Sequence, residues 1–182
     1  MTLAERCKAV QPPMALHGDT APCVVRGEGY YLYTEDNRKI LDMAAGIAVN
    51  ALGHCHPAVI EAAEKQLHTL VHACHNILYY EPYTTLAEKL VEYTGNKYKV
   101  YFSNSGAEAN EGAMKLAKYA TKRNVIISMK NAFHGRTMAC ASITTSNANY
   151  RKFYEPMMPS VYFAEYPYLF RTPYKMEDGK RS

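Results

Sequence analysis

The sequence has no long hydrophobic run. No stretch approaches the roughly 20 consecutive apolar residues that a membrane-spanning helix needs. The N-terminus lacks the apolar segment of a secretory signal peptide and carries the charged residues Glu5, Arg6 and Lys8 instead. We therefore expect a soluble, cytoplasmic protein that does not associate with membranes.

Disulfide and metal motifs are missing as well. The five cysteines are odd in number, lie far apart and form no C-x-x-C pair, so a reducing compartment fits best. His54 and His56 flank Cys55, and His68 and His72 stand four residues apart, on one face of a predicted helix. Because the H-E-x-x-H pattern of zinc enzymes is absent, we predict no metal site.

A strong charge of one sign is absent too, since the formal net charge is only +4. The basic residues that gather around one predicted helix and its end are Lys115, Lys118, Lys122 and Arg123. No aromatic stacking platform or basic repeat accompanies them. We interpret them as a solvated helix face and predict no binding of nucleic acid.

The 182 residues, 48% of them hydrophobic, suffice for one large domain or parts of two. Residues 1 to about 25, with Pro12-Pro13 and Pro22, predict an irregular arm. Residues 30–33 and 39–43 predict a hairpin around a polar turn. Helices are predicted from Pro57, with one buried apolar face, and from Pro82 to a stop at Gly95.

The main signal lies where a strand pattern changes to a helix pattern. Lys99 to Phe102 predicts a strand, a helical period begins at Ala107, and Val125 to Met129 predicts a second strand. The apolar side of this helix holds Ala109, Ala113, Leu116, Ala117 and Ala120. A strand, helix and strand in one sheet imply parallel strands joined by a right-handed crossover, and such turns bind ligands in α/β proteins.

Two interpretations of the turn remain open. Ser105 and Glu108 have the spacing of a capping box, in which each side chain accepts a backbone N–H bond at the helix start. Alternatively, the small Gly106 and Ala107 let an anion approach the unpaired N–H groups at the positive end of the helix. Neither the P-loop nor the G-x-G-x-x-G pattern is present.

A second candidate site, Phe133-His134-Gly135-Arg136, follows the predicted strand Val125 to Met129. It would lie at the same carboxyl edge of the sheet as Gly106 and Ala107. The alternative is an ordinary loop with a buried phenylalanine and a surface arginine.

These segments resemble a known family. They are Ala45 to Pro57, Tyr79-Tyr80-Glu81-Pro82, Ser103-Asn104-Ser105-Gly106-Ala107-Glu108-Ala109-Asn110-Glu111 and Lys130-Asn131-Ala132-Phe133-His134-Gly135-Arg136-Thr137. In this order they resemble the class III aminotransferases, pyridoxal-phosphate enzymes of fold type I. The resemblance extends from about Arg26 to Tyr174 and is strongest to acetylornithine and 4-aminobutyrate aminotransferases.

The resemblance implies an α/β fold of type I that is partial. Residues 1–56 would form the N-terminal arm and hairpin segment of the small domain, and residues 57–182 the first half of the large, mainly parallel sheet domain. Pyridoxal 5'-phosphate would be bound by Ser105, Gly106, Ala107, Phe133 and His134, with Phe133 stacked on the pyridine ring. Arg136 would bind the carboxylate of the substrate. The full-length parent would be a homodimer that acts on amino acids and 2-oxo acids.

The catalytic lysine of the family, which forms a Schiff base with the cofactor, has no match in the sequence. We therefore expect the parent protein to be a transaminase and these 182 residues alone to show no turnover. Two alternatives remain: a non-catalytic remnant that keeps dimerisation or weak phosphate binding, and an unrelated α/β module that binds phosphate or metal.

Overall fold

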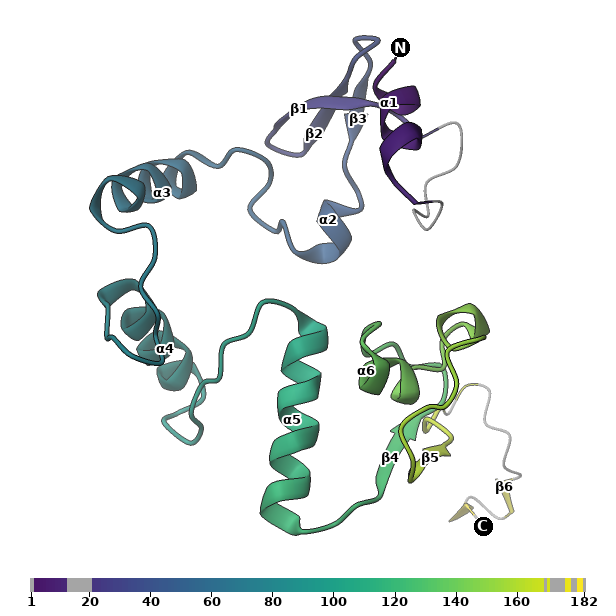
Figure 1. Cartoon of the computed structure of the whole chain (residues 1–182). Coiled ribbons are helices and arrows are strands. Elements are labelled where there is room, and N and C mark those ends of the chain that lie inside the picture. Colours follow the sequence, from purple (N-terminus) through teal and green to yellow (C-terminus); the bar gives the residue numbers. More distant parts are fainter. Residues whose placement is uncertain (1, 13–20, 169, 171–175, 178–179, 182) are drawn as a thin grey trace. The chain divides into compact units, whose positions relative to one another are not determined.

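The computed structural model describes residues 2–12, 21–168, 170, 176–177 and 180–181 (Figure 1). The chain forms two compact units, Met1–Glu81 and Pro82–Ser182. The predicted division after residue 56 stays a prediction.

The first unit begins with helix α1, Leu3–Val10. Its cap is reciprocal: Thr2 Oγ1 accepts a hydrogen bond from the Glu5 N–H at 3.2 Å, and the Thr2 N–H donates to Glu5 Oε2 at 2.8 Å. The predicted irregular arm is therefore wrong for residues 3–10, because a capping box starts a regular helix there. Residues 13–20 of that arm, including Pro13, lie outside the described residues.

An antiparallel sheet follows, with the order β1-β2-β3. Its strands are β1 (Val24–Glu28), β2 (Tyr31–Thr34) and β3 (Lys39–Leu41). The predicted hairpin is confirmed, with Leu32 opposite Ile40. The buried Thr34 closes its turn, since Thr34 Oγ1 accepts from the Arg38 N–H at 2.9 Å.

Helix α3, Pro57–Thr69, begins at Pro57 as predicted. The prediction that one face of it is buried is wrong, because Val59 and Leu67 are 52% and 60% exposed. The predicted shared helical face of His68 and His72 is wrong too, since the helix ends at Thr69. Among the described residues no group of three or more His, Cys, Asp or Glu side chains is placed to hold a metal ion.

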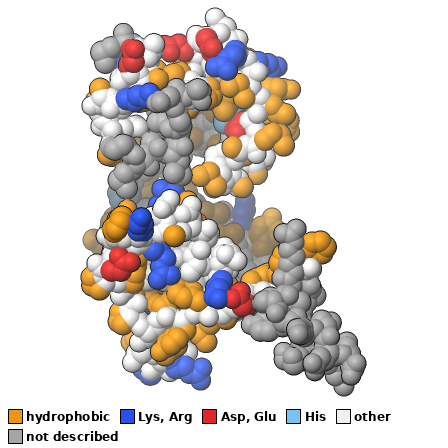
Figure 2. All heavy atoms as spheres, turned by 90° about the vertical axis from the view of Figure 1, so that its right-hand side faces the viewer, with side chains coloured by type: hydrophobic (Ala, Val, Ile, Leu, Met, Phe, Trp, Pro, Cys, Tyr) orange, Lys and Arg blue, Asp and Glu red, His pale blue; other side chains and the backbone are white. Residues whose placement is uncertain are grey.

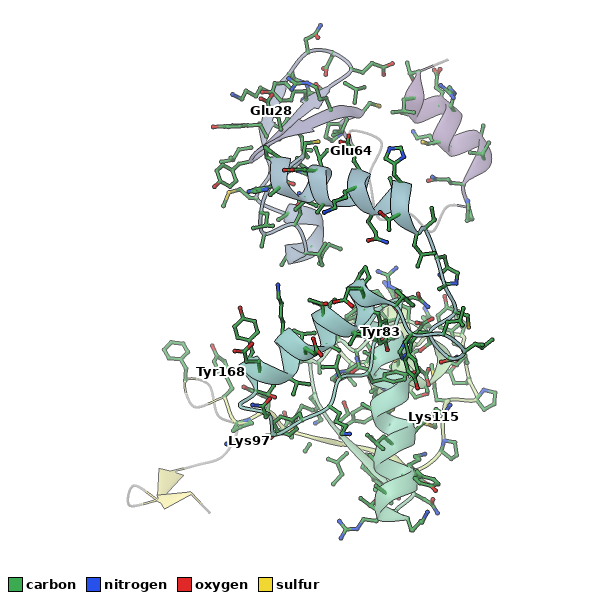
Figure 3. All side chains as sticks on the ribbon, turned by 90° about the vertical axis from the view of Figure 1, so that its left-hand side faces the viewer. Glu28, Glu64, Tyr83, Lys97, Lys115 and Tyr168 are labelled. Carbon is green, nitrogen blue, oxygen red and sulfur yellow. The ribbon has the colours of Figure 1, made fainter. Side chains whose placement is uncertain are left out.

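Helix α4, Glu81–Tyr93, starts one residue before the predicted Pro82 and leads into the second unit. It is followed by Gly95 at φ +65°, which confirms the predicted stop. The ring of Tyr83, labelled on α4 in Figure 3, makes an edge-to-face contact with Phe102 at 4.8 Å between centroids. This contact ties α4 to the extended segment that precedes α5.

Helix α5, Gly106–Thr121, and strand β4, Ile126–Met129, form where the sequence predicts them. The predicted strand Lys99 to Phe102 is wrong: the segment pairs with no neighbouring strand within the described part of the chain. A strand requires hydrogen bonds to a neighbour, and the parallel neighbour of β4 is β5 (Val161–Ala164), with Ile126 opposite Val161. The connection from β4 to β5 contains α6 (Met138–Ile143) and the 3₁₀ turn Ala148–Tyr150.

The core of the second unit lies at α6. Cys140, Ala141 and Ile143 are its buried hydrophobic residues. The buried Ser128 of β4 donates to the Ile143 carbonyl at 2.8 Å, and Thr144 Oγ1 donates to the Cys140 carbonyl at the same distance. Two further short strands, β6 (Met176–Glu177) and β7 (Lys180–Arg181), form an antiparallel pair.

Many apolar side chains are exposed, as the orange atoms of Figure 2 show. An open groove of about 470 Å³ is lined by part of the predicted apolar side of α5, namely Ala109, Ala113 and Leu116, together with Tyr101 and Lys115. Leu116 in this groove is 67% exposed. In the described segments no helix is long and apolar enough to cross a bilayer.

Candidate functional site

The start of α5 is capped by Ser105. Its Oγ accepts a hydrogen bond from the Glu108 N–H at 3.1 Å, which confirms the predicted N-cap. The second half of the predicted capping box is displaced by one residue, because Glu108 Oε2 accepts from the Asn104 N–H at 2.7 Å and not from Ser105. The carboxylate thus lies beside the first turn of the helix, where the helix dipole favours negative charge.

The N–H groups of Gly106 and Ala107 lie at the start of α5. Ala109 donates to the Ser105 carbonyl at 3.0 Å, whereas Gly106 and Ala107 have no acceptor within the described residues. A Cβ built on Gly106 would meet no atom within 4 Å, so the space next to it is open. Two free donors at the positive end of a 16-residue helix can bind a phosphate or another anion.

The loop after β4 lies directly against this helix start. Gly135 has φ +125°, and a Cβ built on it would be only 2.7 Å from the Cβ of Ala107. Glycine is required at this position both by the backbone conformation and by the lack of room. The two motifs that the sequence predicted at one edge of the sheet are therefore neighbours.

Three hydrogen bonds join α5 to residues 134–140. The Asn110 side-chain amide donates to the His134 carbonyl at 2.8 Å, and Thr137 Oγ1 donates to Glu111 Oε1 at 2.6 Å. Cys140 Sγ donates to the carbonyl of Ala107 at 3.3 Å. The helix start and the loop are consequently held in one arrangement.

His134 is half-buried and faces the interior. The backbone N–H of His134 donates to Thr144 Oγ1 at 3.0 Å. Its ring Nε2 lies 3.5 Å from the hydroxyl oxygen of Ser128. These contacts anchor the loop to the core. The prediction that His134 lies near a cofactor stays a prediction.

Phe133 and Arg136 both contact Tyr150, a residue that was not predicted from the sequence. The Phe133 ring is in edge-to-face contact with Tyr150 at 5.2 Å between centroids, and Arg136 Cζ lies 5.0 Å from the centroid of the same tyrosine. Phe133 is 51% exposed, which contradicts the alternative of a buried phenylalanine. No motif or helical period marks Tyr150, because its contacts are tertiary.

Arg136 is exposed and has no acidic partner among the described residues. The tyrosine lies against the guanidinium, whose in-plane N–H groups are the donors that bind a carboxylate in a fork. The arrangement can therefore accept an anionic ligand at this side chain.

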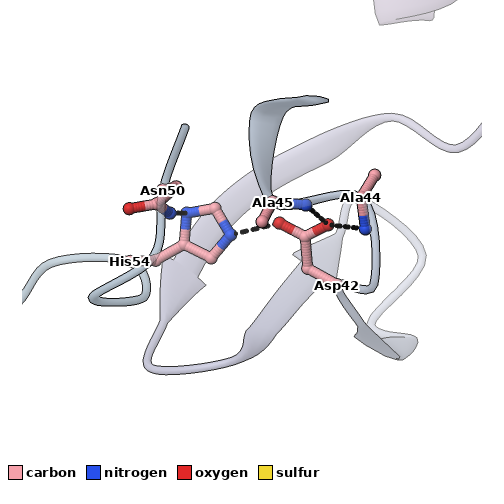
Figure 4. Close-up of polar contacts among 5 residues, drawn as sticks. All are labelled: Asp42, Ala44, Ala45, Asn50 and His54. Atoms are coloured by element: carbon pink, nitrogen blue, oxygen red, sulfur yellow. Dashed lines mark hydrogen bonds and ion pairs between the residues drawn. The ribbon is translucent and has the colours of Figure 1, made fainter. Parts of the chain in front are cut away.

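The first unit holds a separate polar cluster around Asp42, drawn in Figure 4. Asp42 Oδ1 accepts from the Ala44 and Ala45 N–H groups at 3.0 and 2.9 Å, and Asp42 Oδ2 lies 2.7 Å from His54 Nε2. The hydrogen bond from Ala45, followed by that from His54, lowers the pKa of Asp42 below its usual value. Asn50 Nδ2 is 3.1 Å from His54 Nδ1.

This cluster borders a left-handed turn, labelled α2 (Ala45–Ala48). Ala45, Ile47 and Ala48 have φ values of +45°, +65° and +61°. Such values are strained for residues with a Cβ, above all for β-branched Ile47. Asp42 binds the backbone N–H groups of Ala44 and Ala45 at the start of this turn. His54 contacts the side chain of Asn50 just after the turn.

Comparison with known proteins identifies the family. The family model for Aminotransferase class-III matches residues 15–181. The chain is 40% identical over 156 residues to a probable 4-aminobutyrate aminotransferase of Bacillus subtilis (strain 168), covering 85% of this chain and 36% of the relative. It is 47% identical over 141 residues to an acetylornithine aminotransferase of Caldanaerobacter subterraneus subsp. tengcongensis, covering 74% of this chain and 35% of the relative. The chain thus spans about a third of the length of these relatives.

Solved structures agree on the fold. The taurine:2-oxoglutarate aminotransferase from Bifidobacterium kashiwanohense, in complex with PLP (pyridoxal 5'-phosphate) and glutamate, superposes with a TM-score of 0.83 at 22% identity, over 92% of this chain and 38% of that one. An omega transaminase from Pseudomonas jessenii in complex with PMP superposes with a TM-score of 0.81 at 28% identity. The match covers 95% of this chain and 41% of that one. The architecture is therefore part of a fold type I domain, and the chain belongs to the class-III aminotransferase family.

Proposed function

We propose that the chain carries the N-terminal half of the site of a pyridoxal-phosphate-dependent aminotransferase. The full-length parent would transfer an amino group between an amino acid of the acetylornithine, 4-aminobutyrate or ornithine type and a 2-oxo acid. Family membership and the names of the relatives support this proposal.

The phosphate of the cofactor would be held at the start of α5. The free N–H groups of Gly106 and Ala107 are the observation that carries the proposal, because they offer two donors beside open space. The Ser105 hydroxyl, next to them, keeps the first turn of the helix formed by accepting from Glu108.

The ring of the cofactor would lie on Phe133, with His134 behind the loop. The exposed Phe133 ring supplies an apolar surface, and Gly135 keeps the loop close to the phosphate position through its fit against Ala107. When bound, the cofactor supplies an electron-withdrawing pyridine ring next to the reacting carbon of the amino acid.

Arg136 would bind the substrate carboxylate. Its guanidinium has no competing carboxylate within the described part of the chain, and a planar fork of donors suits a carboxylate better than an ammonium group does. The residue would orient the amino acid and would not exchange protons itself.

We further propose that the parent is a cytoplasmic homodimer, divided into residues 1–56 of the small domain and residues 57–182 of the large domain. The five cysteines, all free, support a reducing compartment.

The cofactor site can be tested by titrating ¹⁵N-labelled chain with pyridoxal 5'-phosphate and recording amide NMR spectra. We expect the Gly106 and Ala107 amides to shift on addition, and to shift far less with pyridoxal, which lacks the phosphate. Saturable shifts elsewhere with these two amides unmoved would contradict the proposed site.

The missing lysine predicts no turnover by the 182 residues alone. Incubation with pyridoxal 5'-phosphate and an amino donor should yield no sustained, donor-dependent 2-oxo acid. Steady formation of the oxo acid would refute this expectation. Cofactor binding without turnover would match the alternative of a non-catalytic phosphate-binding role for this chain by itself.

A further inference from the structure

Tyr150 touches both side chains that the proposed function places on the ligand. We propose that Tyr150 is a positioning residue, which holds Phe133 and Arg136 in the arrangement that receives the cofactor ring and the substrate carboxylate. This inference rests on the proposed function, because it concerns how the same site is organised.

Tyr150 lies in a turn that is held in place by hydrogen bonds. The N–H groups of Thr145 and Ser146 both donate to the Ala132 carbonyl, at 2.8 and 3.1 Å, and so tie the chain before the turn to the residue that precedes Phe133. The turn itself is capped, since Asn147 Oδ1 accepts from the Asn149 N–H at 2.9 Å. The half-buried Tyr150 ring therefore has a fixed position relative to the loop.

The contact with Arg136 does not consume its ligand-binding donors. Arg136 Cζ is 5.0 Å from the centroid of the Tyr150 ring, within the range of a cation–π contact. This interaction uses the attraction between the cation and the ring and leaves guanidinium N–H groups for a carboxylate. A long arginine side chain that is already ordered loses less conformational entropy when the ligand binds.

The contact with Phe133 restricts the second ligand-facing side chain. The two rings meet at 5.2 Å with an angle of 66° between their planes, an edge-to-face pair. Phe133 is 51% exposed, so its ring stays accessible to a ligand while the pair with Tyr150 restrains its orientation. Tyr150 therefore couples the orientation of the ring surface to that of the arginine.

The test compares Tyr150→Leu with Tyr150→Phe and with a control at Tyr119. Tyr150→Phe keeps the ring, and Tyr150→Leu removes it. Tyr119 is a matched control because it makes the same kind of contact, with Lys122 Nζ at 4.1 Å, near the far end of α5. Affinities for pyridoxal 5'-phosphate and for inorganic phosphate are measured by amide NMR, together with the side-chain resonances of Arg136.

Tyr150→Leu should weaken binding of pyridoxal 5'-phosphate roughly fivefold. It should leave the affinity for inorganic phosphate unchanged, because the α5 amides hold that anion. The Arg136 side-chain protons should lose the ring-current shift that they have in the wild type. Tyr150→Phe and Tyr119→Leu should behave like the wild type.

Equal losses for both anions in a Tyr150→Leu variant that keeps the wild-type amide spectrum elsewhere would overturn the positioning role, because the effect would then not be specific to the cofactor ring. Retention of the Arg136 ring-current shift in Tyr150→Leu would overturn it as well. If wild-type chain binds neither anion at Gly106 and Ala107, the proposed function fails, and the Arg136 resonances still decide whether Tyr150 orders that side chain.

Discussion

The backbone of Gly135 lies against the side chain of Ala107, so closely that a Cβ on Gly135 would be 2.7 Å from the Cβ of Ala107. This contact joins the helix start that offers free N–H groups to the loop that carries Phe133 and Arg136. Its closeness makes the geometry of the candidate site sensitive to a single methyl group.

Gly135→Ala should destabilise the second unit. Alanine would have to adopt φ +125° and would clash with Ala107, so we expect a loss of about 2 kcal/mol or more in the free energy of unfolding. Urea unfolding followed by circular dichroism measures it. Gly106→Ala is the matched control, with an expected change within about 0.5 kcal/mol, because no atom lies within 4 Å of its Cβ. Equal effects of the two variants would contradict the contact.

Asn110→Asp should also weaken the junction between helix and loop. The substitution places a carboxylate oxygen where an amide N–H donates to the His134 carbonyl, and an unpaired, partly buried carbonyl costs about 1–3 kcal/mol. Thermal unfolding should show a lower midpoint. Asn104→Ala serves as the control, since the side chain of Asn104 is exposed and only its backbone N–H is bonded to Glu108. A midpoint equal to that of the wild type would refute the predicted role of Asn110.

The elements around this junction could be predicted from the sequence because their signals are local. Ser105 and the helical period fix α5, and β-branched residues fix β4. Helix α1 has the same capping-box pattern at Thr2 and Glu5, a local signal that the prediction of an irregular arm did not use. Lys99 to Phe102 has strand-like residues, yet a strand also needs a neighbour, which no local pattern supplies.

Ser105→Ala should cost about 1 kcal/mol of stability by removing the acceptor for the Glu108 N–H. Ser105→Gly should cost less, since glycine tolerates the cap position. Denaturant titration of both variants checks this order. Ser146→Ala, at an exposed loop position, is expected to match the wild type, and a loss of similar size there would show that the Ser105 effect is not specific to the cap.

Acid should loosen the Asp42 cluster. The pKa of Asp42 is lowered in the folded chain, chiefly by the Ala45 N–H and then by His54, so its stabilising contribution is complete above the unfolded value of about 3.9. The contribution disappears as the pH falls through the lower folded value. The protection factors of the hydrogen-bonded Gly29 and His54 amides, which are corrected for the pH dependence of intrinsic exchange, should fall at the acid end between pH 6 and pH 3.

Asp42→Asn isolates this effect from that of Asp36, whose pKa is lowered by hydrogen bonds from Thr34 and Arg38. The difference in protection between wild type and Asp42→Asn should be largest near pH 6 and should shrink toward pH 3. A difference that stays constant over this range would mean that the carboxylate charge of Asp42 contributes nothing.

The composition of the candidate site could be predicted only in part. The glycine and alanine after Ser105 and the loop at Phe133 stand out by motif. The sequence predicted their proximity from a shared sheet edge, but no strand directly precedes α5 in the described part of the chain, and the contacts of Gly135, Asn110 and Cys140 bring them together instead. Tyr150 could not be found in this way, because its relation to Phe133 and Arg136 is set by packing of a turn 14 to 17 residues downstream. The apolar face of α3 is a true periodic pattern, but periodicity does not reveal whether a covering surface is present.

The residues that join α5 to the loop after β4 are close in the sequence, which affects the order in which the chain folds. Asn110 and His134 are 24 residues apart, and Ala107 and Cys140 are 33 apart. Closing such loops costs little more entropy than closing shorter ones, and contacts of low sequence separation form early. The start of α5 and the loop with Arg136 can thus come together as a nucleus on which later parts of a longer polypeptide would condense.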